Sequence, residues 1–258
     1  FLGSNYWKYF GKDGHYIGVD ISLDLVQRAH KGSSEWADGG KASFMVGNVY
    51  NLPFADNAAD AVMCQTLLMH LEDPVLALKE MIRVTKAGGK VIGQEPDNLS
   101  QQLKMRHWSL PDDSIDDLLL RAKVAVLSNR GGIKLGRGDN SIGPKVYLMM
   151  RQLGLVDVNV YTTEYVTHLY PPYIDEQEKT QIEMLQKQWL NEERREILRE
   201  REREEFQAGG GTSEEWSLYC AYSDRVIADM KRQINEERYF YCGAYPFYFT
   251  HGKKPGKM

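Results

Sequence analysis

The chain of 258 residues is 42% hydrophobic and 26% charged, which is typical of one large or two small soluble globular domains. No apolar stretch approaches the ~18 residues of a membrane-spanning helix, and no signal peptide follows Phe1, so we expect neither. The three cysteines, Cys64, Cys220 and Cys242, form no CxxC pair. We therefore expect no disulfide framework, no metal site and a location in the reducing cytoplasm.

The net charge of −4 comes from one segment, Asp175–Phe206, in which acids outnumber bases. Elsewhere in the chain acids and bases balance. Proteins that bind nucleic acids usually carry a basic excess or stripe, so this balance disfavours nucleic acid as a partner. A small molecule is the expected substrate, and a homodimer is a further possibility.

Short β-rich runs alternate with amphipathic helices in the first half of the chain. Strands are predicted at 15–20, 42–46, 60–64 and 90–94. Helices are predicted to start at Ser22, as a side-chain cap, and at Asp73-Pro74, with proline in the first turn. Strands that alternate with helices in this way form right-handed βαβ units and a mainly parallel sheet, so the predicted fold class is α/β.

The second half of the chain is less regular. We predict helical structure over 97–128 with a break at Pro111, a glycine-rich loop over Gly131–Gly143, a helix over 142–153 and a strand over 155–166. Two helical segments follow, over 175–206 and 212–237, and an aromatic strand over 239–250 closes the chain. The charged helical segment is most simply a solvated amphipathic helix, and a partner-binding helix or dimer seam is the alternative.

Asp20 ends the first predicted strand, in the run Gly18-Val19-Asp20-Ile21-Ser22. An acid at the carboxyl end of a parallel strand is placed to accept hydrogen bonds from the hydroxyls of a ribose. Aspartates at strand ends also cap helices. Asp20 alone therefore leaves a nucleotide site and a structural role equally open.

A series of motifs between Tyr16 and Asp97 adds to this signal. They are Phe44-Met45-Val46-Gly47-Asn48-Val49, Leu52-Pro53-Phe54, Asp60-Ala61-Val62-Met63-Cys64-Gln65, Leu67, Leu68, His70, Leu71, Asp73-Pro74, Glu80, Arg83-Val84, Lys86-Ala87-Gly88-Gly89-Lys90 and Gln94-Glu95-Pro96-Asp97. With these residues the chain resembles the class I S-adenosylmethionine-dependent methyltransferases. The resemblance implies a Rossmann-like, doubly wound sheet and S-adenosylmethionine as cofactor, with S-adenosylhomocysteine as its product.

The resemblance also implies roles for single residues. Asp20 would hold the ribose and Ile21 would stack on the adenine, and the loop with Asn48 and Val49 would contact the adenine amino group. Asn48 stands where the family often has an acid, which changes the chemistry of that contact. The segment after the next strand would face the methionine part of the cofactor and its sulfonium; it consists of Gln65, Thr66 and Leu67.

One part of the family pattern is missing from this sequence. The family's first strand and the glycine-rich loop after it have no counterpart here, and Phe1-Leu2-Gly3 resembles the segment that follows that loop. Tyr6–Phe10 would then be helical. On the sequence alone the cofactor site is incomplete at its methionine end.

A second resemblance covers the downstream half. Glu95-Pro96-Asp97, Arg137–Gly143, Tyr147 and Leu153-Gly154-Leu155 are similar to a bacterial methyltransferase subgroup that has a helical insertion before its last strand. It implies a methyltransferase core at 1–172 and 238–258, and an insertion at 173–237 that forms a lid over the substrate.

Methyl transfer to an oxygen or nitrogen atom of a small molecule is therefore the expected activity. A general base is needed only if the acceptor must lose a proton, and its candidates are His70, Glu95, His107 and His168. The expected substrate-contacting residues are Glu95, Asn140, Tyr170, Tyr241 and Tyr245. His70 and the tyrosines have packing roles as alternatives.

Three other functions remain open from the sequence. A catalytically inactive methyltransferase-like binding module and an RNA or protein methyltransferase would share the same motifs. A dinucleotide-dependent oxidoreductase also places an acid on a ribose. The oxidoreductase is disfavoured because the series from Leu52-Pro53-Phe54 to Gly88-Gly89 has no function in it.

Overall fold

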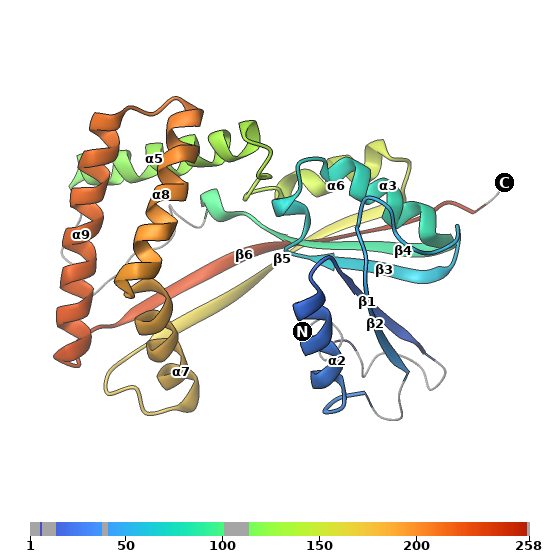
Figure 1. Ribbon diagram of the computed structural model, residues 1–258, viewed down its shortest axis with the longest axis horizontal. Helices are drawn as coiled ribbons and strands as arrows, with labels where there is room; N and C mark the ends of the chain where they lie inside the picture. The colour runs from blue at the N-terminus through green and yellow to red at the C-terminus, as the bar shows by residue number, and fades with distance from the viewer. Residues whose placement is uncertain (1–5, 7–13, 38–40, 101–113, 257–258) are drawn as a thin grey trace.

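The computed structural model describes residues 6, 14–37, 41–100 and 114–256 (Figure 1). The described elements, in chain order, are β1 (Tyr16–Asp20), α2 (Leu23–Ser33), β2 (Ala42–Val46), β3 (Ala59–Gln65), η2 (Leu68–His70), α3 (Pro74–Val84), β4 (Thr85–Pro96), α5 (Ile115–Lys134), α6 (Gly143–Gln152), β5 (Val156–Leu169), α7 (Glu176–Met184), the π-helical turn η3 (Leu185–Trp189), α8 (Glu192–Gly209), α9 (Ser213–Asn235) and β6 (Tyr241–Lys253).

The larger sheet has the strand order β3-β4-β6-β5. β3 and β4 pair in parallel, and β6 pairs antiparallel with both β4 and β5. β3, β4 and β5 therefore run in one direction and β6 runs against them, which confirms the α/β class with a mainly parallel sheet. β1 and β2 pair in parallel in a second sheet of their own. The expected single sheet is thus divided in the part of the chain that the structure describes.

The two predicted helix starts near the sheets are confirmed. The hydroxyl of Ser22 accepts a hydrogen bond from the Leu25 amide at 3.4 Å and caps α2. The carboxylate of Asp73 accepts one from the Leu76 amide at 2.8 Å, and Pro74 occupies the first turn of α3. Both caps satisfy amides that have no partner inside their own helix.

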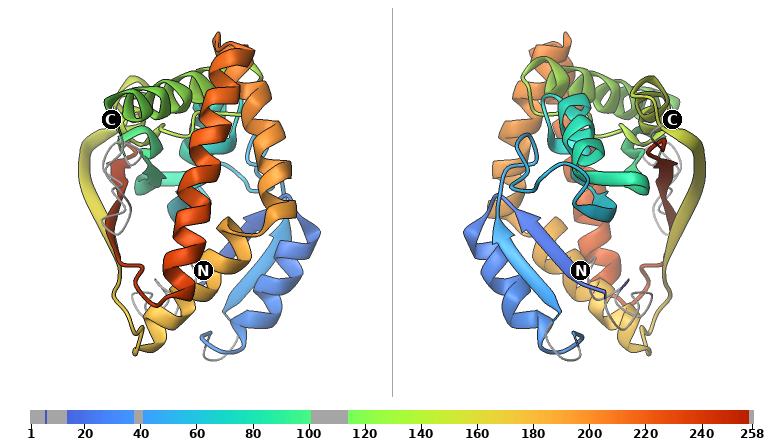
Figure 2. Two further views of the ribbon diagram at one scale, coloured as in Figure 1. Left: turned by 90° about the vertical axis from the view of Figure 1, so that its left-hand side faces the viewer. Right: turned by 90° about the vertical axis from the view of Figure 1, so that its right-hand side faces the viewer.

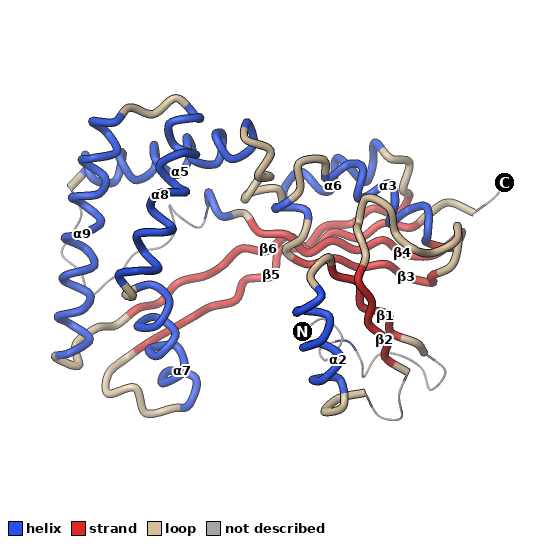
Figure 3. The backbone as a smooth tube through the Cα atoms, in the orientation of Figure 1, coloured by secondary structure: helices blue, strands red, loops and turns tan. Residues whose placement is uncertain are grey.

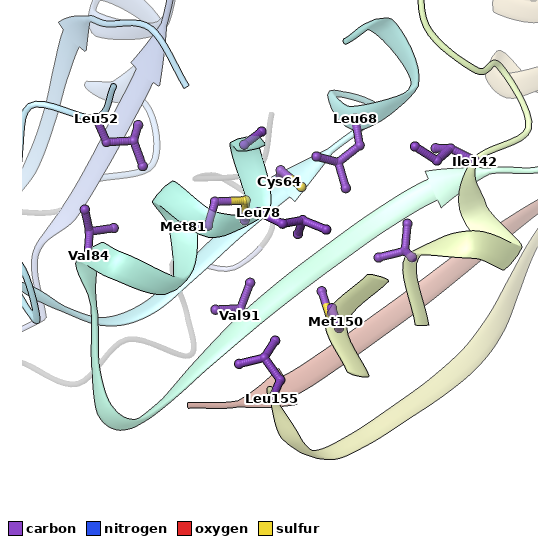
Figure 4. Packing of buried hydrophobic residues seen from close by; sticks show 12 residues of the cluster. Leu52, Cys64, Leu68, Leu78, Met81, Val84, Val91, Ile142, Met150 and Leu155 are labelled. Atoms are coloured by element: carbon purple, nitrogen blue, oxygen red, sulfur yellow. The ribbon is translucent and has the colours of Figure 1, made fainter. Parts of the chain in front are cut away.

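The main apolar core lies between the larger sheet and the helices α3 and α6, which Figure 1 shows on the same side of that sheet. Figure 4 shows its side chains converging from β3, β4 and the two helices. The fully buried members include Leu68, Leu78, Val91 and Met150. Each such side chain contributes about 1.5–3 kcal/mol by leaving water, so this cluster fixes the strands whose ends carry the predicted site.

The helices α5, α8 and α9 form a second region, reached by the long strands β5 and β6 (Figures 1 and 3). Figure 2 shows α8 and α9 running alongside each other, and they are joined by ion pairs from Arg195 and Arg199 to Asp224 at 2.8 and 2.5 Å. Along the chain, the helices from α7 to α9 come between β5 and β6, where the insertion was expected. The division into domains and the lid function stay predictions.

Two predictions for the helical region are wrong. Gly131–Gly143 is not a loop throughout, because α5 continues to Lys134. A side chain on Gly131 would place its Cβ 1.6 Å from the Glu205 carbonyl oxygen, so this glycine permits a close helix crossing and breaks no helix. The single helix expected over 175–206 is divided at Leu190-Asn191, because Asn191 accepts a hydrogen bond from the Arg194 amide and starts α8.

No helix in the described ranges is long and apolar enough to cross a membrane. All three cysteines are free: Cys64 is buried, Cys242 is exposed and Cys220 lies between these extremes. The predicted helix at residues 7–10, the break at Pro111 and the candidate base His107 lie outside the described residues.

Candidate active site

Asp20 lies at the turn between β1 and α2. One of its carboxylate oxygens, Oδ1, accepts a hydrogen bond from the Ser22 amide at 2.8 Å and thereby shapes the turn. The neighbouring Ile21 is 73% exposed, which is unusual for a large apolar side chain at a strand end. The turn therefore presents a carboxylate and an apolar surface side by side.

The loop after β2 is attached to this turn. The Gly47 amide donates to the Asp20 carbonyl at 3.0 Å, and Cβ of any larger residue at 47 would lie 2.7 Å from Val19. The next residue, Asn48, accepts a hydrogen bond from the Tyr50 amide at 2.9 Å through its side-chain oxygen. The structure thus places the loop of Asn48 next to Asp20, and local bonding fixes the Asn48 side chain.

The turn after β3 contains the third predicted set, Gln65, Thr66 and Leu67. The Thr66 amide donates to the Gln94 carbonyl of β4 at 2.9 Å, and the backbone of Thr66 is left-handed, with φ of 47°. A β-branched residue in that conformation is strained, so neighbouring contacts must hold it there. Glu95, at the end of β4, supplies such contacts to the residues that follow.

Glu95 has no exposed surface. Its Oε1 accepts hydrogen bonds from the amides of Leu67 and Leu68, both at 3.0 Å, and its Oε2 accepts one from Met69 at 3.3 Å. Burial raises the pKa of the Glu95 carboxyl, and the three amides and the Cys64 thiol oppose that rise. These contacts do not favour the predicted contact with an acceptor or a role as general base, which would need an accessible carboxylate.

The loops after β2 and β3 also contact each other. The Asp73 amide donates to the Tyr50 hydroxyl at 3.1 Å. Val19 and Val49 pack against the core cluster that contains Leu68. The carboxyl ends of β1, β2, β3 and β4 therefore lie around one common region, although they belong to two sheets.

His70, a candidate base, follows this region and is exposed. Partial burial of the ring, and then the positive charge of Arg201 on α8, lower the pKa of His70. A neutral imidazole can accept a proton, so the chemistry of a base is available to His70. The influence of Arg201 places α8 near the site, which the sequence did not reveal.

Asn140 lies in a loop that packs against the same turn. Cβ of any larger residue at Gly138 would be 2.2 Å from the Met69 carbonyl oxygen. The Asn140 amide donates to the side chain of Asn129 at 3.0 Å, and Asp139 accepts hydrogen bonds from Asn129 and the Ser141 amide and pairs with Lys145. Burial raises the pKa of Asp139, but Lys145 and the amide donors outweigh it and hold that pKa below its usual value.

The remaining predicted residues lie along the strands that reach the helices. Tyr241 is buried in an apolar cluster with Leu169, Leu190 and Met230, and Tyr170 is 72% exposed. Tyr245 is half-buried on β6. His168 is exposed, with its ring within 4.8 Å of carboxylates of Asp175 and Glu178. The three tyrosines and His168 do not lie at the turns after β1 to β4. The described contacts therefore do not bring all the predicted residues into a single site.

An open cavity of about 660 Å³ lies where the loop of Asn140 meets α8. Its lining residues are Arg137, Ile197, Glu200, Arg201 and Glu204. None of them was expected to be a site residue from the sequence. Arg137 opens the motif Arg137–Gly143, which was a usable signal, whereas Arg201 is hidden within the long charged run of α8.

Comparison with known proteins gives a match to a family described as "Methyltransferase domain" over residues 2–93. An uncharacterized methyltransferase of Schizosaccharomyces pombe is 37% identical over 119 residues, which are 44% of this chain and 41% of that protein. A demethylmenaquinone methyltransferase of Renibacterium salmoninarum is 48% identical over 79 residues, which are 31% of each protein. The chain thus spans less than half the length of these curated relatives.

Among solved structures, the YcgJ protein of Bacillus subtilis superposes with a TM-score of 0.47 at 14% sequence identity. The alignment covers 94% of this chain and 83% of that protein. The matched family segment, residues 2–93, contains the turns after β1, β2 and β3 and ends within β4.

Proposed function

Residues 2–93 belong to the methyltransferase domain family, and from that premise we propose that this protein transfers a methyl group from S-adenosylmethionine to an oxygen or nitrogen atom of a small-molecule acceptor. The observation that carries the proposal is the hydrogen bond from the Gly47 amide to the Asp20 carbonyl. It joins the turn after β1 to the turn after β2, and both turns contain residues that are predicted to contact the nucleoside. Both turns lie in the matched segment.

The residues present fit the nucleoside part of the cofactor. Asp20 uses one carboxylate oxygen, Oδ1, for the Ser22 amide, and no described contact involves Oδ2, so Oδ2 can accept hydrogen bonds from ribose hydroxyls. The exposed Ile21 offers an apolar surface for the adenine ring. Asn48 and Val49 would contact the edge of the adenine, and Gln65, Thr66 and Leu67 would contact the methionine part.

The bound cofactor supplies an electrophilic methyl group on its sulfonium. The contribution of this chain is to orient the acceptor toward that group and to keep water away. If the acceptor must lose a proton, His70 is the best candidate to take it, because it is exposed beside the site and its lowered pKa favours the neutral ring. His168 is a weaker candidate, because it lies near Asp175 and Glu178 at the start of α7 and not at the turns after β1 to β4.

A small molecule is the proposed acceptor. Some relatives are named demethylmenaquinone methyltransferases, which supports an acceptor of this class. The open cavity of about 660 Å³ beside α8 has a suitable size for one. We propose that Asn140 borders the acceptor, that the helices of 173–237 act as a lid, and that Tyr170, Tyr241 and Tyr245 contribute only if that lid closes.

Calorimetric titration of the full-length protein with S-adenosylmethionine, S-adenosylhomocysteine and NAD tests this function. The proposal predicts micromolar binding of both sulfur-containing ligands and no binding of NAD. Binding of NAD alone would favour an oxidoreductase. Binding of S-adenosylmethionine without turnover on small molecules, RNA or protein would favour a binding module.

A further inference from the structure

The short helical turn η2 (Leu68–His70) begins without a cap from its own sequence. Leu67 occupies the position before the helix, and its apolar side chain makes no capping hydrogen bond. The amides at the start of a helix have no partners within it and need an acceptor from elsewhere. A buried turn without such an acceptor would be costly.

Glu95 supplies that acceptor from 26 to 28 residues further along the chain. Its two carboxylate oxygens accept hydrogen bonds from three successive amides, those of Leu67, Leu68 and Met69, at 3.0, 3.0 and 3.3 Å. A carboxylate at the amino end of a helical turn is favoured both by these donors and by the orientation of the peptide dipoles. Glu95 is therefore the cap of η2.

We propose that Glu95 is a positioning residue for methyl transfer: its carboxylate holds the turn 67–69 so that Gln65, Thr66 and Leu67 meet the cofactor on one side and His70 faces the acceptor on the other. This inference rests on the proposed function. It replaces a direct contact between Glu95 and the acceptor with an indirect effect through the backbone.

Two observations support a dependence of the turn on this cap. Thr66 keeps its left-handed backbone immediately before the three capped amides, and its own amide is fixed to the Gln94 carbonyl next to Glu95. The side chain of Leu68 is fully buried in the main core, so the turn cannot shift without disturbing that cluster. The cap, the strained residue and the core contact all lie within four consecutive residues, 66–69.

Few other ionisable groups face Glu95 among the described residues. The Cys64 thiol of β3 donates to Oε1 at 3.8 Å, and Tyr248 is the residue of β6 paired with Glu95. Burial raises the pKa of Cys64 well above its usual value, so this thiol stays uncharged at neutral pH. On acidification two groups at this turn take up protons, Glu95 and the nearby His70. Protonation of Glu95 weakens the acceptor at the three amides, and Glu95→Gln separates this effect from that of His70.

The substitution Glu95→Gln tests the inference. It keeps the size of the side chain but turns an NH₂ group toward one of the three amides, so two donors face each other. We expect the amides of Leu67, Leu68 and Met69 to exchange hydrogen about tenfold faster or more, and the Kd for S-adenosylmethionine to rise about tenfold. Glu178→Gln is the matched control, since Glu178 is also a buried carboxylate that accepts a backbone amide, from Tyr170, but on α7.

The pH profile separates positioning from a merely structural role. In the wild type, cofactor affinity should fall on acidification, as the Glu95 carboxyl with its raised pKa takes up a proton. In Glu95→Gln that step should be absent. If the variant does not fold, the pH dependence of the three amide signals in the wild type gives the same titration.

Different results identify different failures. Unchanged amide exchange and unchanged cofactor affinity in Glu95→Gln would overturn the inference. A rise in acceptor KM without any change in cofactor Kd would also overturn the inference, because it would mean that Glu95 contacts the acceptor directly. No binding of S-adenosylmethionine by the wild type would overturn the proposed function and with it the catalytic part of this inference, while faster amide exchange would still identify the cap.

Discussion

The sheet side and the helical side of this protein are held together by different kinds of contact. The sheet side has an apolar core in which twelve residues from Leu52 to Leu155 are buried (Figure 4). The helical side has two smaller clusters, a close crossing of α5 and α8 at glycines, and ion pairs that join α8 to α9. The sheet side has ion pairs as well, such as Arg83 with Glu80, but they lie outside its core. Apolar packing tolerates changes of pH and salt, whereas ion pairs and buried charges respond to both. The proposed lid is thus on the more responsive side. The cofactor turns lie on the apolar side, where the buried Glu95 carboxylate makes one turn an exception that responds to acid.

Gly131→Ala should produce the largest change, and on the helical side only. Its Cβ would lie 1.6 Å from the Glu205 carbonyl oxygen, a backbone atom that cannot move away without shifting α8. We expect a loss of about 3 kcal/mol or more in the free energy of unfolding of the helical side, measured by urea denaturation with hydrogen exchange. Gly32→Ala is the control, because a Cβ there meets nothing within 4 Å and alanine favours the helix. Equal, small effects of both substitutions would mean that no close crossing exists.

Gly131 also shows how far the sequence can predict the fold. Strand and helix positions in the sheet region follow from local patterns, such as the caps Ser22 and Asp73, because those signals act within a few residues. The sequence does not distinguish a glycine inside a helix from a glycine that ends one. The distinction here depends on the backbone of α8, which is far from Gly131 in the sequence but packs against it. The same limit applies to the proposed site. Asp20 is expected from its place at a strand end and Asn48 from the resemblance to the methyltransferases, whereas the burial of Glu95 and the approach of Arg201 depend on long-range packing.

Glu202→Gln should reveal the effect of a half-buried acid on the helical side. Burial, and then the nearby Glu205, raise the pKa of Glu202 to about 7. A raised pKa in the folded state means that the stability contributed by Glu202 is complete below pH ~4.5 and is lost as the pH rises through about 7. The variant should therefore be more stable than the wild type at pH 8, by about 2 kcal/mol, with little difference at pH 4.5. Thermal melts across this range, with the exposed Glu193→Gln as control, measure it; a difference independent of pH would contradict the assignment.

Asp20→Ala should weaken cofactor binding while leaving both sides folded. The loss of charge-assisted hydrogen bonds to the ribose corresponds to about 1–3 kcal/mol in the binding free energy of S-adenosylmethionine. Calorimetry of the variant beside Asp24→Ala, an acid on the adjacent helix that pairs with Arg28, provides the comparison. Unchanged affinity in Asp20→Ala would remove Asp20 from the site.

Arg137→Ala should have the smallest effect of these substitutions. It removes a contact between the sheet side and the helical side. Arg137 reaches from the loop of Asn140 to Glu204 and Glu205 of α8, at 2.5 and 3.3 Å. Because these groups are partly exposed, we expect only a two- to fivefold rise in acceptor KM, with less difference at high salt and no change in cofactor Kd. Arg225→Ala, which breaks an ion pair to Asp117 within the helical side, is the control. A larger effect on cofactor Kd than on acceptor KM would show that the two sides do not divide these functions.

The central claim is that the turns after β1, β2 and β3, together with the turn capped by Glu95, form one cofactor site on the sheet side. Hydrogen exchange of the full-length protein with and without S-adenosylhomocysteine tests this claim most directly. The account predicts protection at residues 20–22, 47–50 and 65–69, and little change along α9. Protection confined to the helical side, or no protection in any of the three turns when the ligand is bound, would contradict it.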